Sequence, residues 1–134
     1  MSQNDDRPIS TEKDTDIAFN IFSEITTIDG ADYRIGKITL VGELDASVAA
    51  QFRDEIERIA TQKPSRLVLI MTDLDYMASA GLRALVFARQ KMGSGVDIYT
   101  VGLHDAVLET IEMTGFHHSV IMLPDYDTAV IEAF

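Results

Sequence analysis

The sequence predicts an α/β domain whose mixed, mostly parallel sheet is covered by about four helices. Three observations carry this prediction. The unbroken apolar run Leu67–Met71 is typical of a strand that is covered on both faces. After residue 47, helix and strand patterns alternate, as in strand–helix–strand units with parallel strands. Before residue 47, two strand patterns flank turn residues at 29–32, which favours a hairpin or close neighbours.

The first strand is predicted at 17–28, where β-branched and aromatic residues partly alternate with polar ones, and the second at 33–41. Residues 42–47 break the strand pattern. A helix follows, and Asp45 or Ser47 is expected to cap its start. Its apolar positions recur at helical spacing: Val48, Phe52, Ile56 and Ile59.

The central strand at 67–71 leads into a predicted loop at 73–78. The next helix opens at Ser79 and ends at Gly93, with Leu82, Leu85 and Met92 facing inward. The remaining elements are predicted as strands at 96–101 and 119–123 and helices at 105–114 and 125–134.

Composition limits the classes of function. The chain has 134 residues, 46% of them hydrophobic, which suits one domain with an ordinary core. Its 11 Lys+Arg and 22 Asp+Glu give a net charge of −11, which argues against direct binding to nucleic acid or to anionic membranes. Cysteine is absent and the three histidines lack metal-site spacing, so we expect no metal and no cofactor.

The chain divides into an N-terminal segment, residues 1–16, and one domain, residues 17–134. The segment holds five acids and almost no apolar side chains, so we expect a flexible acidic tail. The sequence shows no secretory signal and no apolar run of about 18 residues. We therefore expect a cytoplasmic protein.

Ser79 is the most informative position for function. In parallel sheets the functional loops lie beyond the carboxyl ends of the strands, and Ser79 follows the central strand there, at the first turn of a helix. A phosphate on its hydroxyl would be stabilised by the unpaired N–H groups of the helix start. It would add about −1.5 to −2 charges and leave the helix intact. The alternative is that Ser79 only caps this helix.

Neighbouring residues could form a docking surface with Ser79. On the predicted helix, Arg83, Phe87 and Gln90 share a stripe with Ser79. Arginine and aromatic residues often anchor interfaces, although Phe87 could equally lie under the neighbouring helix. Asp45 follows a strand that should adjoin the central one. It is either a helix cap or a polar contact for the same partner.

Three motifs in register resemble a known family. They are the run Gly42-Glu43-Leu44-Asp45-Ala46-Ser47, then Leu67-Val68-Leu69 followed by Ala78-Ser79-Ala80-Gly81-Leu82, and then Val107-Leu108-Glu109-Thr110 with Met113-Thr114-Gly115-Phe116. Together they resemble a STAS domain of the bacterial anti-sigma-factor antagonist type, over residues 17–134.

The resemblance implies a protein that acts by binding. Its unmodified form would bind a serine kinase that is also an anti-sigma factor, and would thereby free the sigma factor. The kinase would phosphorylate Ser79, and a metal-dependent serine phosphatase would restore it; a homodimer is a further candidate assembly. The partner-binding residues expected beside Ser79 are Asp45, Ser47, Ala78, Ala80, Gly81, Arg83 and Phe87.

This chain departs from the family pattern at two positions. The family usually has Asp-Ser-Ser/Thr-Gly-Leu, whereas here Ala78 replaces the acid and Ala80 replaces the second hydroxyl. A hydroxyl only at position 79 fits a switch with a single site. The alternative is a STAS interaction scaffold in which Ser79 is never modified.

Two enzyme-like alternatives are weaker. A serine hydrolase would need a small residue where Met77 stands and could draw only on Asp97 and His104 to complete a triad. A response-regulator receiver with Asp73 or Asp75 as phosphoacceptor would need a late lysine, and none follows Lys91. The adjacent His117 and His118 are interpreted as residues of a solvated loop whose rings point apart, not as a metal site or pH sensor.

Overall fold

One five-stranded sheet forms the centre of the domain. A computed structural model describes residues 19–28, 30 and 32–134. The strands lie in the order β2-β3-β4-β5-β6. Their bounds are β2 Phe19–Ile28, β3 Tyr33–Leu44, β4 Arg66–Met77, β5 Asp97–Val101 and β6 Ile121–Leu123. Only the β2/β3 pair is antiparallel, so the prediction of a mixed, mostly parallel sheet with the run 67–71 at its centre is confirmed. The expected tail, 1–16, lies outside the described residues.

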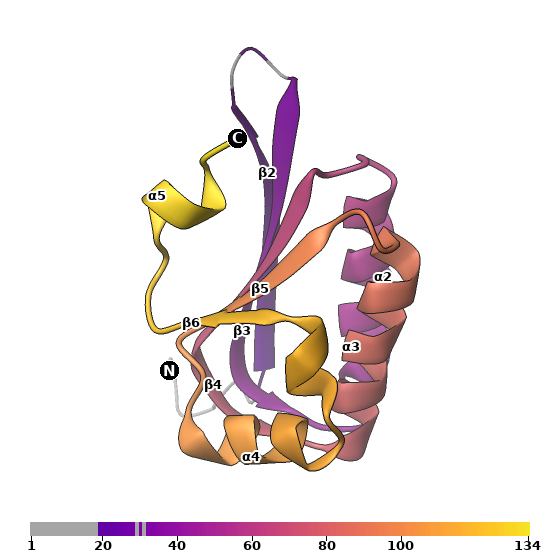
Figure 1. The fold of residues 1–134 in the computed structure, drawn as a ribbon. Coiled ribbons are helices and arrows are strands. Elements are labelled where there is room, and N and C mark those ends of the chain that lie inside the picture. The colour runs from indigo at the N-terminus through magenta and orange to yellow at the C-terminus, as the bar shows by residue number, and fades with distance from the viewer. Residues whose placement is uncertain (1–18, 29, 31) are drawn as a thin grey trace, which may run out of the picture.

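Helices cover the two faces and one end of this sheet. Their bounds are α2 Ala49–Ala60, α3 Ser79–Met92, α4 Asp105–Met113, the 3-10 helix η1 Phe116–Ser119, and α5 Thr128–Ile131. Figure 1 shows α2 and α3 side by side on one face, α5 on the other, and α4 at the end of the sheet where β4 and β5 finish. Within the described residues, no helix combines the length and the apolar character that a bilayer crossing requires.

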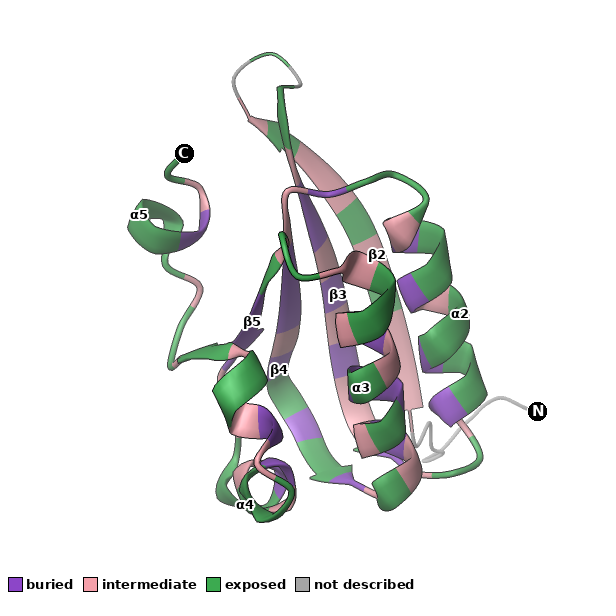
Figure 2. Ribbon diagram, turned by 45° about the vertical axis from the view of Figure 1, so that its right-hand side comes forward, coloured by how far each residue is buried: buried purple, intermediate pink, exposed green. Residues whose placement is uncertain are grey.

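The core has two parts, one on each face of the sheet. The larger part packs the sheet against α2 and α3, and includes Phe52, Ile56 and Leu85, all fully buried. Figure 2 shows the buried faces of both helices turned toward the strands and the exposed faces turned outward. The smaller part, on the opposite face, packs Val68 and Tyr99 against Ile131 of α5. Burial on both faces explains the continuous apolar run in β4.

Two β-bulges extend β4 beyond its predicted end. Residues 73–78 were predicted to form a loop, which is wrong: the strand continues to Met77, and β3 likewise continues to Leu44. Twice along the β3/β4 pair, β4 advances one residue more than β3, once after Thr39 and once after Gly42. Each extra residue changes the spacing of core side chains from two to three. The β4 side chains in the larger part of the core are therefore Leu67, Leu69, Met71, Leu74 and Met77.

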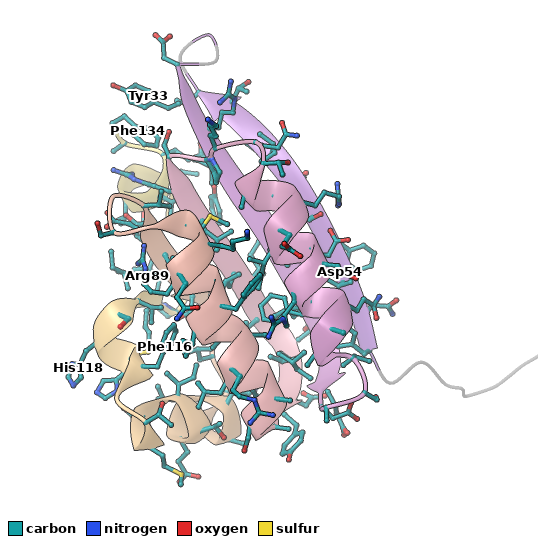
Figure 3. All side chains as sticks on the ribbon, turned by 90° about the vertical axis from the view of Figure 1, so that its right-hand side faces the viewer. Tyr33, Asp54, Arg89, Phe116, His118 and Phe134 are labelled. Carbon is teal, nitrogen blue, oxygen red and sulfur yellow. The ribbon has the colours of Figure 1, made fainter. Side chains whose placement is uncertain are left out.

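The C-terminal elements are shorter than predicted. The last helix spans only Thr128–Ile131, not 125–134; the Asp127 carboxylate caps its start by accepting a hydrogen bond from the Ala129 N–H at 3.0 Å. Phe134 lies beyond this helix and stacks on Tyr33, with ring centroids 4.2 Å apart (Figure 3). The strand predicted at 119–123 begins only at Ile121, because η1 occupies the residues before it.

Candidate functional site

Ser79 is the first residue of α3, where its hydroxyl is exposed to solvent. The N-cap is Ala78, in extended conformation, and no side chain caps this helix. The alternative in which Ser79 caps its own helix is therefore wrong. The first N–H groups of α3 have no partners within the helix, so this end carries partial positive charge beside a free hydroxyl.

The start of α3 is held against the ends of β3 and β4. The Ala78 N–H donates to the Leu44 carbonyl oxygen at 2.9 Å, which confirms that the two strand ends are neighbours. Gly81 is buried beneath the first turn, where a Cβ atom would lie 2.8 Å from the Leu44 side chain and 3.0 Å from that of Met77. Gly81 was expected to bind the partner. Instead it lets the first turn of α3 pack closely on Leu44 and Met77, and it offers no exposed side chain.

Asp45 and Ser47 form a turn directly after β3. The Asp45 carboxylate accepts hydrogen bonds from the Ser47 N–H at 2.9 Å and the Ser47 hydroxyl at 2.6 Å. The prediction that Asp45 or Ser47 caps α2 is wrong: the N-cap is Val48, and no side chain makes a capping hydrogen bond there. Asp45 stands one residue beyond Leu44, just as Ser79 stands one residue beyond Ala78. The backbone hydrogen bond between Leu44 and Ala78 thus places Asp45 and Ser79 at the same end of the sheet, where β3 and β4 finish.

Phe87 lies in the seam between α2 and α3. Its side chain is half-buried against the core, and the Arg53 guanidinium of α2 lies 4.3 Å from its ring centroid. Of the two interpretations of Phe87, packing against the neighbouring helix is the one that the structure favours. Arg83, one turn nearer Ser79, is exposed. The surface formed by Asp45, Ser47, Ser79 and Arg83 is called the Ser79 surface below.

A family comparison decides the classification. The model of the STAS domain family matches residues 23–129. The chain belongs to the STAS domain family. The resemblance found in the sequence is thereby confirmed.

The relatives of this STAS domain include several anti-sigma factor antagonists. It is 24% identical over 90 residues to the anti-sigma-F factor antagonist RsfB of Mycobacterium tuberculosis, covering 66% of this chain and 74% of RsfB. An anti-sigma factor antagonist from Mycobacterium paratuberculosis has a TM-score of 0.70 at 22% identity, covering 85% of this chain and 96% of that one. The phosphorylated Bacillus cell fate determinant SpoIIAA has a TM-score of 0.59 at 15% identity, covering 83% and 97%. These structures share its fold.

The sequence interpretation missed Tyr76, which adjoins the Ser79 surface in this STAS domain. Tyr76 is 48% exposed and pairs in register with Glu43 of β3. Asp75, beside it, is also exposed. The second bulge of β4 turns these side chains outward. The apolar spacing of three, at Met71, Leu74 and Met77, is the sequence signal that could have revealed this arrangement.

The other chemistry considered does not assemble. Asp97 begins β5 and His104 follows the end of that strand. The two residues therefore lie at opposite ends of β5, about 13 Å apart along the strand. The hydrolase triad is therefore not formed.

Across the described ranges, no three His, Asp or Glu side chains are grouped to hold a metal ion. His117 and His118 lie in η1, and their ring centroids are 3.9 Å apart, so the expectation that the rings point apart is wrong.

The turn at Asp45 supports a prediction about pH. The Ser47 hydroxyl, and then its N–H, lower the pKa of Asp45 below its ordinary value of 3.8, because both donate to the ionised form. Ser47→Ala is expected to raise the pKa of Asp45 toward that value, as measured by NMR titration of its carboxyl carbon. Ser94→Ala, in the exposed turn after α3, is the matched control and should leave it unchanged. An equal pKa in the Ser47 variant would show that the N–H alone holds the carboxylate.

Proposed function

We propose that this STAS domain is a cytoplasmic anti-sigma-factor antagonist that acts by binding and not by catalysis. Its partner is an anti-sigma factor that is also a serine kinase. Unmodified, the domain binds this partner through the Ser79 surface and frees the sigma factor. Phosphorylation of Ser79 ends the binding, and a serine phosphatase restores it. Transcription is thus regulated without contact with DNA.

One observation carries this proposal: the exposed hydroxyl of Ser79 at the first turn of α3. A kinase can reach this oxygen without unfolding the domain. The unpartnered N–H groups of the helix start stabilise the added phosphate, so the fold is kept. Similarity to proteins described as anti-sigma factor antagonists supports the identity of the partner.

The switch acts through charge added to a surface that is already acidic. Glu43 and Asp75 are exposed near the strand ends, and hydrogen bonds from Ser47 lower the pKa of the Asp45 carboxyl in the turn beside them. A phosphate adds about two negative charges among these carboxylates. A partner surface that fits the unmodified hydroxyl must then accommodate a hydrated dianion, and removing water from that dianion costs free energy.

The substitutions at Ala78 and Ala80 leave Ser79 as the sole hydroxyl in the motif. Both alanines are half-buried, so they lie beside the Ser79 surface without projecting polar groups. The kinase must therefore recognise Ser79 without a neighbouring acid. A single phosphorylation site gives a switch with two states.

Mass spectrometry after incubation with the purified kinase and ATP tests the proposal. The kinase is first captured from extract of the source cell. We expect one phosphoryl group, at Ser79, and none in Ser79→Ala. A kinase that binds the domain and never modifies Ser79 would replace the switch with an unmodified scaffold.

Association should depend on salt. The net charge of −11 favours a partner with a basic rim, which accelerates encounter at low ionic strength. We expect the association rate constant, measured by stopped flow, to fall about tenfold as the Debye length shortens from about 30 Å to about 3 Å. A rate constant unaffected by salt would contradict a basic rim.

A further inference from the structure

A groove separate from the Ser79 surface lies between α4 and β6. Its volume is about 500 Å³, and its lining is mainly apolar. Its apolar lining residues include Leu103 and Leu108, from the loop after β5 and from α4, and Met122 and Pro124, from β6 and the residue that follows it. Figure 1 shows α4 running below β6, beside the loop that leaves β5. We call this cavity the α4–β6 groove; none of its lining residues belongs to the Ser79 surface.

Hydrogen bonds hold the floor of this groove in place. His104 Nε2 lies 2.6 Å from the Thr72 carbonyl oxygen, and the Gly102 N–H donates to the Leu123 carbonyl oxygen at 2.9 Å. Gly102 has φ +72°, and a Cβ atom there would lie 2.5 Å from Thr72 Oγ1. Glycine thus lets β4 and the loop after β5 approach closely. The groove is preformed, which reduces the ordering cost of binding.

Most of the groove lining comes from a part of the chain that has acids and no bases. Residues 92–134 contain no Lys or Arg, and their seven acids are Asp97, Asp105, Glu109, Glu112, Asp125, Asp127 and Glu132. Glu112 is part of the groove lining. Asp105 and Glu109 are exposed on α4, and Asp125 is exposed directly after Pro124. An apolar groove that is lined by Glu112 and formed in part by an acidic helix favours an occupant that is apolar on one side and cationic on the other.

We propose that the α4–β6 groove binds a short amphipathic, cationic segment of a protein partner. Apolar side chains of the segment enter the groove against Leu108 and Met122, and its Lys or Arg side chains meet Glu112 and the acids of α4. Methionine suits such a surface because its unbranched side chain adapts to the occupant, and Met122 is 39% exposed. A symmetric contact between two copies of the chain is disfavoured, because it would bring the same carboxylates together. This inference does not depend on phosphorylation of Ser79.

Binding of a defined peptide to the full chain tests the proposal. The probe is a fluorescent helical peptide of about 14 residues, built of Leu on one face and Lys on the other. A Leu/Glu peptide of the same length and pattern is the matched probe. We expect the Leu/Lys peptide to bind and the Leu/Glu peptide not to bind, as measured by fluorescence anisotropy.

Two variants with the same change of charge distinguish the effect of a carboxylate in the groove from the effect of the protein's net charge. Glu112→Lys is expected to weaken binding of the Leu/Lys peptide roughly five- to tenfold. Asp54→Lys, on α2 and away from α4 (Figure 3), should weaken it less than about twofold, because salt screens distant exposed charges. Met122→Gln keeps the net charge and should weaken binding roughly fivefold through lost apolar contact. All three side chains are exposed, so the fold should tolerate the changes.

Several outcomes would overturn the proposal. If Glu112→Lys and Asp54→Lys weakened peptide binding equally, the effect would be due to the net charge of the protein and not to the groove. Equal binding of both peptides would indicate an apolar ligand without a charge requirement. In NMR spectra with the Leu/Lys peptide, shifts should concentrate at Gly102, Leu103 and Leu108, and shifts spread over α2 and β2 would place binding elsewhere. A dimer in sedimentation that Met122→Gln abolishes would show that a second copy fills the groove.

Discussion

Ser79→Glu is expected to weaken binding to the proposed anti-sigma factor partner by at least about tenfold, because a contact surface that fits a neutral hydroxyl would have to desolvate the added carboxylate. The side chain of residue 79 is exposed at the first turn of α3, so the variant should fold normally. An acidic residue in the first turn also interacts favourably with the helix dipole. We therefore expect the melting temperature to change by less than about 2 °C. Isothermal titration calorimetry and thermal unfolding measure the two effects.

Two control variants separate charge from size. Ser79→Ala should bind the proposed partner with the affinity of the unmodified protein and should remain bound when the proposed kinase and ATP are present. Ser79→Gln has nearly the size of glutamate and no charge, so it should lie closer to Ser79→Ala in affinity. Equal affinity of the Glu and Gln variants would attribute the loss to steric conflict and would remove the electrostatic basis of the switch.

The sequence located the Ser79 surface because local signals and topology agree there. The buried run in β4 identifies the central strand, and the amphipathic pattern after Ser79 identifies the helix that follows it. Parallel connection rules then bring the end of β3 beside Ser79, as the bond between Ala78 and Leu44 shows. Such inferences need only periodicity and chain order.

The features that the sequence did not reveal depend on contacts between distant residues. The bulges in β4 arise from its register with β3, and they expose Tyr76. Because residues 73–78 were predicted as a loop, the sequence did not indicate which way the Tyr76 side chain faces. The Asp45 side chain could bond either to the start of α2 or within its own turn, and only the backbone geometry decides between them. The short α5 reflects the position of Phe134, which packs on Tyr33 about 100 residues away.

Leu44→Ala is expected to cause the largest loss of stability near the site. Leu44 is fully buried, and its side chain lies where any side chain at residue 81 would have to go, so it supports the first turn of α3. Removing it leaves a cavity beneath Gly81. We expect the free energy of unfolding to fall by about 3 kcal/mol and the melting temperature by about 10 °C. Denaturant titration and thermal unfolding measure these losses.

The same substitution tests whether the strand end positions Ser79. The Ala78 N–H, which donates to the Leu44 carbonyl, should exchange with solvent faster in Leu44→Ala than the global loss of stability explains, because the helix start opens locally. Leu82→Ala is the matched control, because Leu82 lies in α3 and is half-buried. We expect it to lower the free energy of unfolding by about 1 kcal/mol without a selective change in the exchange of the Ala78 N–H. Unchanged relative protection of Ala78 in Leu44→Ala would mean that the Leu44 side chain is not needed to hold the start of α3. Faster exchange confined to the first turn would show that Leu44 fixes the position of the Ser79 hydroxyl at the start of α3.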